Sequence, residues 1–297
     1  MTDRQWTGKT DGTPWMLRSL VWLLKRFDVR LLYAVMSVVV IFYIIFRPSG
    51  TKAQYILFRH RLKWSFLRSC IGVYKNHYMF GQVILDRFAS YAGREYKIVT
   101  DGMEIMEQWM SDEDGFVVIS SHVGNHEMAG YSVRRHSKPM YALAFGGEKQ
   151  MVTDYRRQMF EAANINLFTL NDDMSHVFLI HDALSKGAVV TLFGDRIFGS
   201  EKTITAKVLG VDAFLPAGPF AVSVAERKKV LMMFVMKERW NTYHIICKPL
   251  VNSLQKYSGN KKQKMQELAD NYADTLADIV SQYPTQWFHY YNFWQAE

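Results

Sequence analysis

The chain has 297 residues, of which 49% are hydrophobic and 22% charged, so it can bury a sizeable core as one large domain or one domain with an appendage. Its two cysteines, Cys70 and Cys247, lie far apart and without metal-ligand spacing, which argues against a disulfide framework and favours a reducing compartment. The formal net charge of +8 indicates attraction to anions. A phospholipid surface, an acidic carrier protein, a phosphorylated substrate and nucleic acid are all compatible with that charge.

The first 92 residues are predicted to form a polar leader and a helical region that attaches to a membrane. Residues 1–14 are polar, and residues 15–92 have the pattern of several helices. The run from Leu31 to Phe46 has sixteen residues without a charge, so as a helix it extends about 24 Å, short of the roughly 30 Å hydrocarbon core. Basic residues flank the run on both sides, which suits helices that dip into an anionic cytoplasmic leaflet. Of the three alternatives for this run, we favour monotopic attachment first, a buried core helix second and a helix that spans the membrane last.

The remainder, residues 93–297, is predicted to be an α/β domain. Short apolar runs alternate with amphipathic helical stretches, which favours βαβ units and a mainly parallel central sheet flanked by helices. The expected strands are 116–121, 140–145, 165–170 and 188–193, and the expected helices between them are near 127–136, 149–163 and 172–186. After these we expect a helix from Pro216 to Arg227, strands over Val230–Met236 and Tyr243–Cys247, and a helix from about Lys261 to Val280.

Polar residues crowd the carboxyl end of the first of these strands. The apolar run Phe116–Ile119 is short and largely β-branched, and it is followed by Ser-Ser-His-Val-Gly-Asn-His-Glu over 120–127. In an open α/β sheet, ligands bind at this edge, so His122 is a candidate general base and Glu127 its orienting acid. Gly124 and Asn125 fall in the turn between the strand and the next helix, where glycine most easily adopts a tight conformation.

A second polar cluster, Gly194-Asp195-Arg196, follows the predicted strand at 188–193. By the same argument from the sheet edge, it could lie beside the loop that carries His122. Arg196 would suit a phosphate or a developing oxyanion, and it would equally suit an ion pair with Asp195 or another nearby acid.

These residues resemble those of a known family. The segment Ser-His-Val-Gly-Asn-His-Glu at 121–127 resembles the His-x4-acid signature of the lysophospholipid acyltransferase superfamily, and specifically its bacterial lipid A biosynthesis branch of lauroyl and myristoyl acyltransferases. Two further segments resemble motifs of that branch: Gly194-Asp195-Arg196 with Phe214–Gly218, and Tyr-Pro-Thr-Gln-Trp-Phe at 283–288. The lipid A enzymes often have Asp-Gln or Asp-Glu where this chain has Asp195-Arg196, so it is also similar to a broader group of predicted acyltransferases, some of which are associated with amino-acid lipids or aryl polyenes.

The resemblance implies a glycerolphosphate acyltransferase-like fold on the cytoplasmic face of the inner membrane, held by a monotopic region or a single N-terminal anchor. The implied reaction moves an acyl chain from acyl carrier protein or acyl-CoA to a hydroxyl or amine of a lipid acceptor, without a further cofactor or a covalent acyl-enzyme. The acceptor would be lipid A-like, a lysophospholipid or an amino-acid lipid. His122 and Glu127 would be catalytic, and the substrate would be bound by Gly124, Asn125, Asp195 and Arg196.

Two other readings of the same residues are open. In a metal-dependent hydrolase, His122 and His126 would bind a metal that activates water; however, His122 ends a strand, and the order is not His-Glu-x-x-His, so we expect no metal. In a non-catalytic basic membrane-binding protein, His122 would be a core histidine, but that reading leaves Gly124, Glu127 and the Asp195 cluster unexplained. No recognised nucleic-acid-binding motif accompanies the basic residues, and we expect no nucleic-acid partner.

Overall fold

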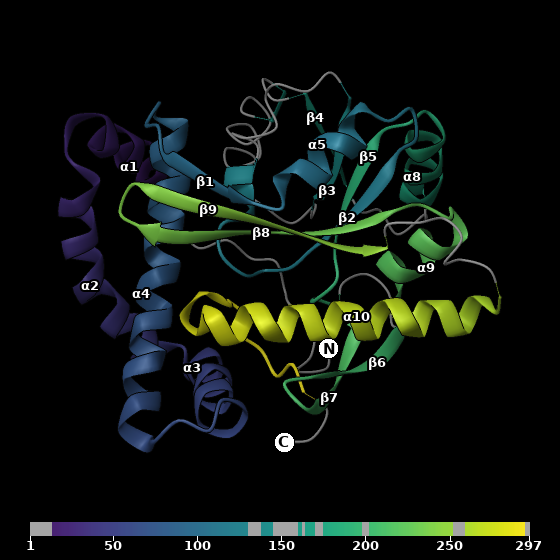
Figure 1. Cartoon of the computed structure of the whole chain (residues 1–297). Coiled ribbons are helices and arrows are strands. Elements are labelled where there is room, and N and C mark those ends of the chain that lie inside the picture. The colour runs from purple at the N-terminus through teal and green to yellow at the C-terminus, as the bar shows by residue number, and fades with distance from the viewer. Residues whose placement is uncertain are drawn as a thin grey trace.

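The computed structural model describes residues 14–129, 138–144, 160–161, 164–169, 175–197, 202–251 and 259–294 (Figure 1). Its N-terminal part is helical, as the sequence predicts for residues 15–92. The elements are α1 (Pro14–Arg26), α2 (Val29–Phe46), α3 (Pro48–Ile56), the π-helical turn η1 (Leu57–Arg61) and α4 (Phe66–Tyr91). Figure 1 shows α1, α2 and α4 together at one end of the sheet. Apart from Pro14, the predicted polar leader lies outside the described residues.

Local sequence signals set the boundaries of these helices. Asp28 is the N-cap of α2, and its side chain accepts a hydrogen bond from the backbone N–H of Arg30 at 2.8 Å. Pro48 begins α3, and the residue before it, Arg47, leaves the helical region and ends α2. Ser65 caps α4 in the same way as Asp28 caps α2.

A seven-stranded sheet forms the centre of the described structure, in the order β1-β9-β8-β2-β5-β3-β4. All neighbouring strands are parallel except β8 and β9, which form an antiparallel hairpin, so the predicted mainly parallel α/β architecture is confirmed. The strands are β1 (Lys97–Asp101), β2 (Phe116–Ser120), β3 (Met140–Ala144), β4 (Ile165–Thr169), β5 (Val189–Phe193), β8 (Val230–Arg239) and β9 (Thr242–Val251).

Helices cover both faces of this sheet, which is why its central strands are continuous apolar runs. Side chains alternate along a strand. In β2, Val117 and Ile119 therefore belong to one core cluster, and Phe116 and Val118 belong to the other. The first cluster lies under α8 (Ser175–Ser185), α9 (Ala217–Ala225) and α10 (Lys261–Gln282), and the second lies under α5 (Met103–Ser111).

Several predicted elements differ from the structure. Residues 126–129 form only a short 3₁₀ turn, η2 (His126–Ala129), where a helix over 127–136 is predicted, and residues 130–137 lie outside the described part. Most of the predicted helix at 149–163 also lies outside it. The sequence interpretation missed β1 and the separate hairpin of β6 (Thr203–Val208) and β7 (Val211–Pro216).

Helix α2 presents a long apolar surface to the outside of the fold. Its 18 residues have a mean hydropathy of 2.4, and only 17% of them are buried, so by length and composition it could cross a membrane. This low burial does not fit a core helix of a soluble protein. The exposed apolar side chains of α1 and α2, with Phe27 between them, form what we call the N-terminal apolar surface: Trp15, Met16, Trp22, Phe27, Leu31, Val35, Val38, Val39, Ile41, Phe42, Tyr43, Ile45 and Phe46.

A buried ion pair joins the N-terminal helices to the sheet. Lys237 of β8 donates to Asp86 of α4, and both side chains are at most 3% exposed. Tyr33 of α2 and Tyr243 of β9 also donate to Asp86, and Lys237 Nζ lies 3.1 Å from the Tyr33 hydroxyl. The network therefore fixes α2 and α4 against the β8–β9 hairpin.

Replacing Asp86 with alanine is expected to lower the free energy of unfolding by about 3–5 kcal/mol, because it leaves the Lys237 charge buried and unpaired. The double variant Asp86→Leu with Lys237→Met should recover much of that loss. Denaturant unfolding in detergent, followed by tryptophan fluorescence, measures both effects. Asp182→Ala, which breaks the exposed Asp182–Lys186 pair, is the control and should change stability far less. A similar loss in Asp86→Ala and Asp182→Ala would contradict this account of the pair.

Candidate active site

The polar residues after β2 and β5 meet at one edge of the sheet. These strands are parallel neighbours with Ser120 opposite Phe193, so the residues that follow them emerge together. The backbone N–H of Gly194 donates to the carbonyl of Ser120 at 3.0 Å and continues the strand pairing by one residue. The predicted approach of Asp195 to the loop that carries His122 is therefore confirmed.

His122 and Asp195 form a two-point contact. The Nδ1 atom of His122 lies 2.8 Å from Oδ1 of Asp195, and the backbone N–H of His122 donates to Oδ2 at 2.8 Å. The Asp195 carboxylate is buried, whereas the His122 side chain keeps 21% of its exposure. A carboxylate on Nδ1 favours the tautomer with its proton there, which leaves Nε2 as the proton acceptor.

The surroundings hold this pair in the charge states that a base requires. Burial alone would raise the pKa of the Asp195 carboxyl, but the hydrogen bonds from His122 and the charges of His122 and Arg196 outweigh it and lower the pKa to about 2. Burial, followed by the positive charge of Arg196, lowers the pKa of His122 below 6.5, while Asp195 opposes that shift. At neutral pH the imidazole is thus uncharged, and it faces an ionised carboxylate.

The structure corrects the predicted pairing of His122 with Glu127, because Asp195 and not Glu127 holds Nδ1. The carboxylate of Glu127 is 3% exposed. It accepts a hydrogen bond from the Tyr91 hydroxyl at 2.6 Å and forms an ion pair with Arg87, whose Nε lies 3.1 Å from it. Arg87 and Tyr91 are four residues apart on α4 and so share one face of that helix. Glu127 is thereby tied to α4, and a part for it in catalysis stays a prediction.

The turn after His122 requires the glycine at position 124. Gly124 has φ +69°, and a Cβ atom there would lie 2.1 Å from the carbonyl oxygen of Val235 in β8. The next residue, Asn125, donates its backbone N–H to that same oxygen at 2.7 Å. The Asn125 side-chain amide is buried and donates to the Tyr243 hydroxyl at 3.2 Å. These contacts shape the turn, and the predicted substrate contacts of Gly124 and Asn125 stay predictions.

Arg196 directly follows Asp195 in the chain and is half-buried. Its Nη2 donates to the carbonyl of Phe288 at 2.8 Å. Phe288 belongs to the C-terminal segment that follows α10, and the sequence interpretation did not place this segment at the site. Burial lowers the pKa of Arg196, and the charge of Asp195 opposes that shift. A phosphate or oxyanion contact and a charge-balancing role beside Asp195 are both compatible with this position.

His126 lies near His122, but the two rings meet edge to face with their centroids 5.9 Å apart. Both rings also contact the ring of Phe193. Within the described part of the chain, no three His, Cys, Asp or Glu side chains are grouped as ligands for a metal ion.

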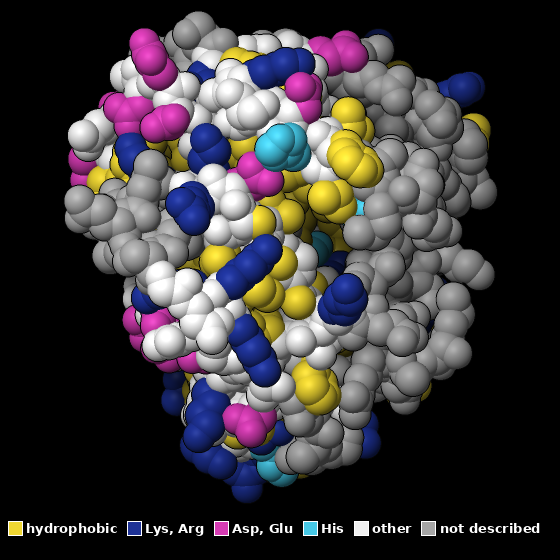
Figure 2. All heavy atoms as spheres, turned by 90° about the vertical axis from the view of Figure 1, so that its right-hand side faces the viewer, with side chains coloured by type: hydrophobic (Ala, Val, Ile, Leu, Met, Phe, Trp, Pro, Cys, Tyr) yellow, Lys and Arg dark blue, Asp and Glu magenta, His cyan; other side chains and the backbone are white. Residues whose placement is uncertain are grey.

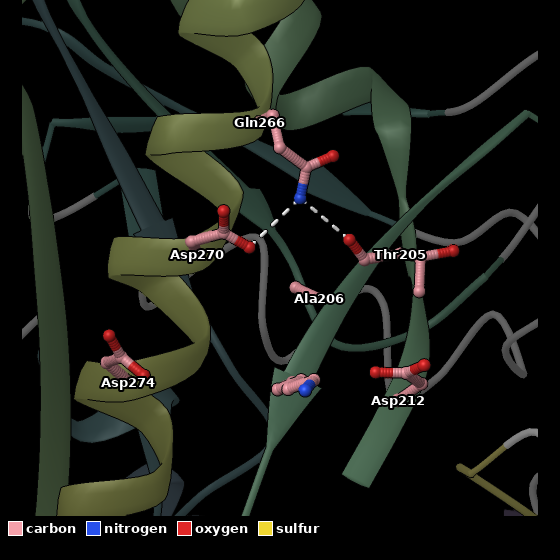
Figure 3. A pocket seen from close by; sticks show the side chains of 7 residues that line it. Thr205, Ala206, Asp212, Gln266, Asp270 and Asp274 are labelled. Atoms are coloured by element: carbon pink, nitrogen blue, oxygen red, sulfur yellow. Dashed lines mark hydrogen bonds between the residues drawn. The ribbon is translucent and has the colours of Figure 1, made fainter. Parts of the chain in front are cut away.

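A polar pocket lies away from this site, between the β6–β7 hairpin and α10 (Figure 3). Gln266 crosses it, with its amide nitrogen 2.8 Å from the carbonyl of Thr205 and 2.9 Å from Oδ1 of Asp270. The lining residues are Thr205, Ala206, Lys207, Asp212, Gln266, Asp270 and Asp274. None of them is among the predicted site residues.

Comparison with known proteins gives one family match. Residues 79–296, which include His122, Asp195 and the C-terminal segment, match the family model described as bacterial lipid A biosynthesis acyltransferase. No curated protein shows significant sequence similarity to the chain. Among solved structures, the chain is similar to the 1-acyl-sn-glycerophosphate (LPA) acyltransferase PlsC from Thermotoga maritima. The two share 13% sequence identity over 87% of this chain and 98% of that chain, with a TM-score of 0.39.

Proposed function

The chain belongs to the bacterial lipid A biosynthesis acyltransferase family, and from this premise we propose that it moves a fatty acyl chain from a thioester donor to a hydroxyl or amine of a lipid acceptor, with His122 as general base. The observation that carries the proposal is the contact of 2.8 Å between His122 Nδ1 and the buried Asp195 carboxylate at the carboxyl edge of β2 and β5. This contact leaves Nε2 as the acceptor for a proton.

In the proposed reaction, Nε2 of His122 removes the proton of the acceptor as its oxygen or nitrogen attacks the thioester carbonyl carbon. Asp195 stabilises the imidazolium that forms. The tetrahedral intermediate then collapses, the bond from carbon to sulfur breaks, and the leaving thiolate takes the proton from His122. General-base catalysis typically contributes about 10²–10⁴-fold, so alignment and oxyanion stabilisation supply the rest. Arg196 is the proposed group for the developing oxyanion or for a phosphate of the substrate.

The donor is proposed to be acyl carrier protein or acyl-CoA, with no further cofactor. Both donors are anionic, and the net charge of +8 favours their approach. Figure 2 shows Lys and Arg side chains, together with hydrophobic ones, over the described part of the face that is turned toward the viewer. Arg134, Arg135, Arg156 and Arg157 are further basic residues that could meet an acidic carrier protein or a phosphate, and they lie outside the described residues.

The proposed location is the cytoplasmic face of the inner membrane. The N-terminal apolar surface carries tryptophans as well as aliphatic side chains, a composition that favours the membrane interface. Arg18, Lys25, Arg26 and Arg30 lie among these residues and would meet anionic headgroups. Monotopic attachment and a single anchor through α2 are both compatible with this surface.

In the dependence of activity on pH, the acidic limb is expected to have its midpoint below pH 6.5. The base must be unprotonated, and burial and the charge of Arg196 lower the pKa of His122 below the ordinary histidine value. The measurement is kcat/KM between about pH 5 and 8, which reports the pKa of the free enzyme. An acidic limb with its midpoint above 6.5 would contradict the proposed environment of His122.

Lipid profiling of a deletion strain tests the function and identifies the acceptor, which is proposed to be lipid A-like, a lysophospholipid or an amino-acid lipid. One species that lacks a single acyl chain should accumulate. The wild-type protein should restore the normal profile, and His122→Ala, produced at the same level, should not. Identical profiles in the parent and deletion strains, or restoration by His122→Ala, would overturn the proposal.

A further inference from the structure

The C-terminal segment that follows α10 contacts the loop of His122 at several points. The backbone N–H of Phe288 donates to the carbonyl of His122 at 3.0 Å, and that of Gly124 donates to the carbonyl of Gln286 at 2.8 Å. Between these bonds, Val123 and Trp287 form an antiparallel bridge. The turn that carries the proposed base is therefore paired along its length with residues 286–288.

The same segment is anchored to β8. The side-chain amide of Gln286 is buried and makes two hydrogen bonds to the backbone of Lys237, accepting from its N–H and donating to its carbonyl, both at 2.9 Å. Lys237 is also paired with Tyr243 of β9. Gln286 thus adds two hydrogen bonds to the backbone of β8 and fixes the segment against the sheet.

Two N-terminal helices hold the segment from the other side. Gln54 of α3 and Asn76 of α4 donate to the carbonyl of Trp287 at 3.2 and 3.0 Å, and both side chains are fully buried. Residues 286–288 consequently lie between the helical region and the proposed catalytic turn. Any shift of the segment would be passed to His122 through its carbonyl.

The side chain of Trp287 reaches the carboxylate of the pair. It is fully buried, its ring contacts that of His289 at a tilt with the centroids 4.1 Å apart, and its indole Nε1 lies 3.3 Å from Oδ2 of Asp195. The indole can only donate, so this contact favours the ionised carboxylate. With Oδ2 held by Trp287 and the backbone of His122, Oδ1 is directed at Nδ1.

We propose that Trp287 is a positioning residue for acyl transfer: its indole N–H and its pairing with Val123 hold Asp195 and His122 in the geometry in which Nε2 takes the proton of the acceptor. This inference rests on the proposed function of His122. Trp287 is fully buried, and in this role it acts through Asp195. A misplacement of about 1 Å can cost about 10²-fold in rate, so the loss of this support should be visible in kcat.

The test compares Trp287→Phe with Trp294→Phe. Trp294 is the matched control, because it lies in the same aromatic cluster and is only 3% exposed. Its indole N–H donates to the carbonyl of Val208 at 3.1 Å and not to Asp195. Each variant removes the same atoms and one indole hydrogen bond. Trp287→Phe should lower kcat by about 10–100-fold with little change in KM, whereas Trp294→Phe should stay within about twofold of wild type.

The pH profile separates positioning from packing. Without the indole donor, the charge of Asp195 is less dispersed and stabilises the protonated imidazole more strongly, so the acidic limb of kcat/KM should move to higher pH in Trp287→Phe alone. The inference would be overturned by equal losses of kcat in both variants. It would also be overturned if Trp287→Phe kept the wild-type kcat and the wild-type acidic limb of kcat/KM. If thermal unfolding shows that Trp287→Phe is misfolded, benzothienylalanine introduced at position 287 keeps the bicyclic shape without the N–H, and the same outcomes decide.

His122→Ala in the same assay distinguishes the two proposals. If that variant keeps full activity, the proposed base fails, and the Trp287 inference fails with it. If His122→Ala is inactive and Trp287→Phe behaves like Trp294→Phe, only the positioning inference fails.

Discussion

Replacing His122 with alanine is expected to abolish acyl transfer while leaving the fold and membrane attachment intact. The imidazole supplies the proposed base. General-base catalysis typically contributes about 10²–10⁴-fold, and the removal of the imidazole should lower kcat by at least this factor. The side chain is 21% exposed and packs on one face against Phe193, so little of the core depends on it.

Initial rates with a thioester donor and a lipid acceptor measure this effect. Circular dichroism and sedimentation with anionic vesicles check that the fold and membrane attachment are unchanged. His126→Ala is the matched control, because its ring also packs against Phe193 but lies 5.9 Å from that of His122. We expect a milder loss there. Full activity in His122→Ala would rule out the proposed mechanism.

The second large effect is expected from Asp195→Asn. Asparagine keeps the shape of the side chain but cannot stabilise the imidazolium, and its amide can favour the wrong tautomer of His122; an equivalent change in a Ser-His-Asp triad lowers kcat by about 10⁴. Because the charge of Asp195 raises the pKa of His122, its loss should also move the acidic limb of kcat/KM to lower pH. The measurements are kcat and the pH dependence of kcat/KM, each compared between Asp195→Asn and the wild-type protein.

Glu127→Gln provides the contrast for that variant. The Glu127 carboxylate is paired with Arg87 and Tyr91, so its neutralisation should mainly lower the free energy of unfolding. It should lower kcat less than Asp195→Asn does. A larger loss of kcat in Glu127→Gln than in Asp195→Asn would reverse the assignment of the orienting acid.

The central strands are the easiest to predict from the sequence, because they are buried on both faces of the sheet. Phe116–Ser120 is buried at every position, and such a run is visible as continuous hydrophobicity. Strand β1 is not predicted because it is mostly exposed, and Lys-Ile-Val-Thr-Asp gives neither an apolar run nor a clean alternation. Strand β6, Thr-Ile-Thr-Ala-Lys-Val, does alternate polar and apolar residues, so its pattern is typical of a half-buried strand and the sequence interpretation overlooked it.

The sequence predicts those contacts of the site that follow from neighbouring parallel strands. It does not predict the contacts made by a segment that is distant in sequence. The approach of Asp195 to His122 follows from two parallel strands that end at one edge. Closeness in sequence favours Glu127 as the orienting acid. In the structure, however, Gly124 and Asn125 contact Val235 of β8, and Glu127 forms its ion pair with Arg87 of α4. Nothing local in the sequence indicates that Trp287 pairs with Val123, because that contact depends on where α10 ends relative to the sheet.

The most direct test of the account is a stoichiometric assay of the purified protein in lipid vesicles. Mass spectrometry would follow the acyl thioester and the lipid acceptor identified from the deletion strain. The account predicts that the wild-type protein consumes one thioester for each acyl chain gained by the lipid, and that His122→Ala forms acylated lipid at least about 10²–10⁴-fold more slowly. Thioester hydrolysis without acylated lipid, or equal acylation by His122→Ala, would contradict it.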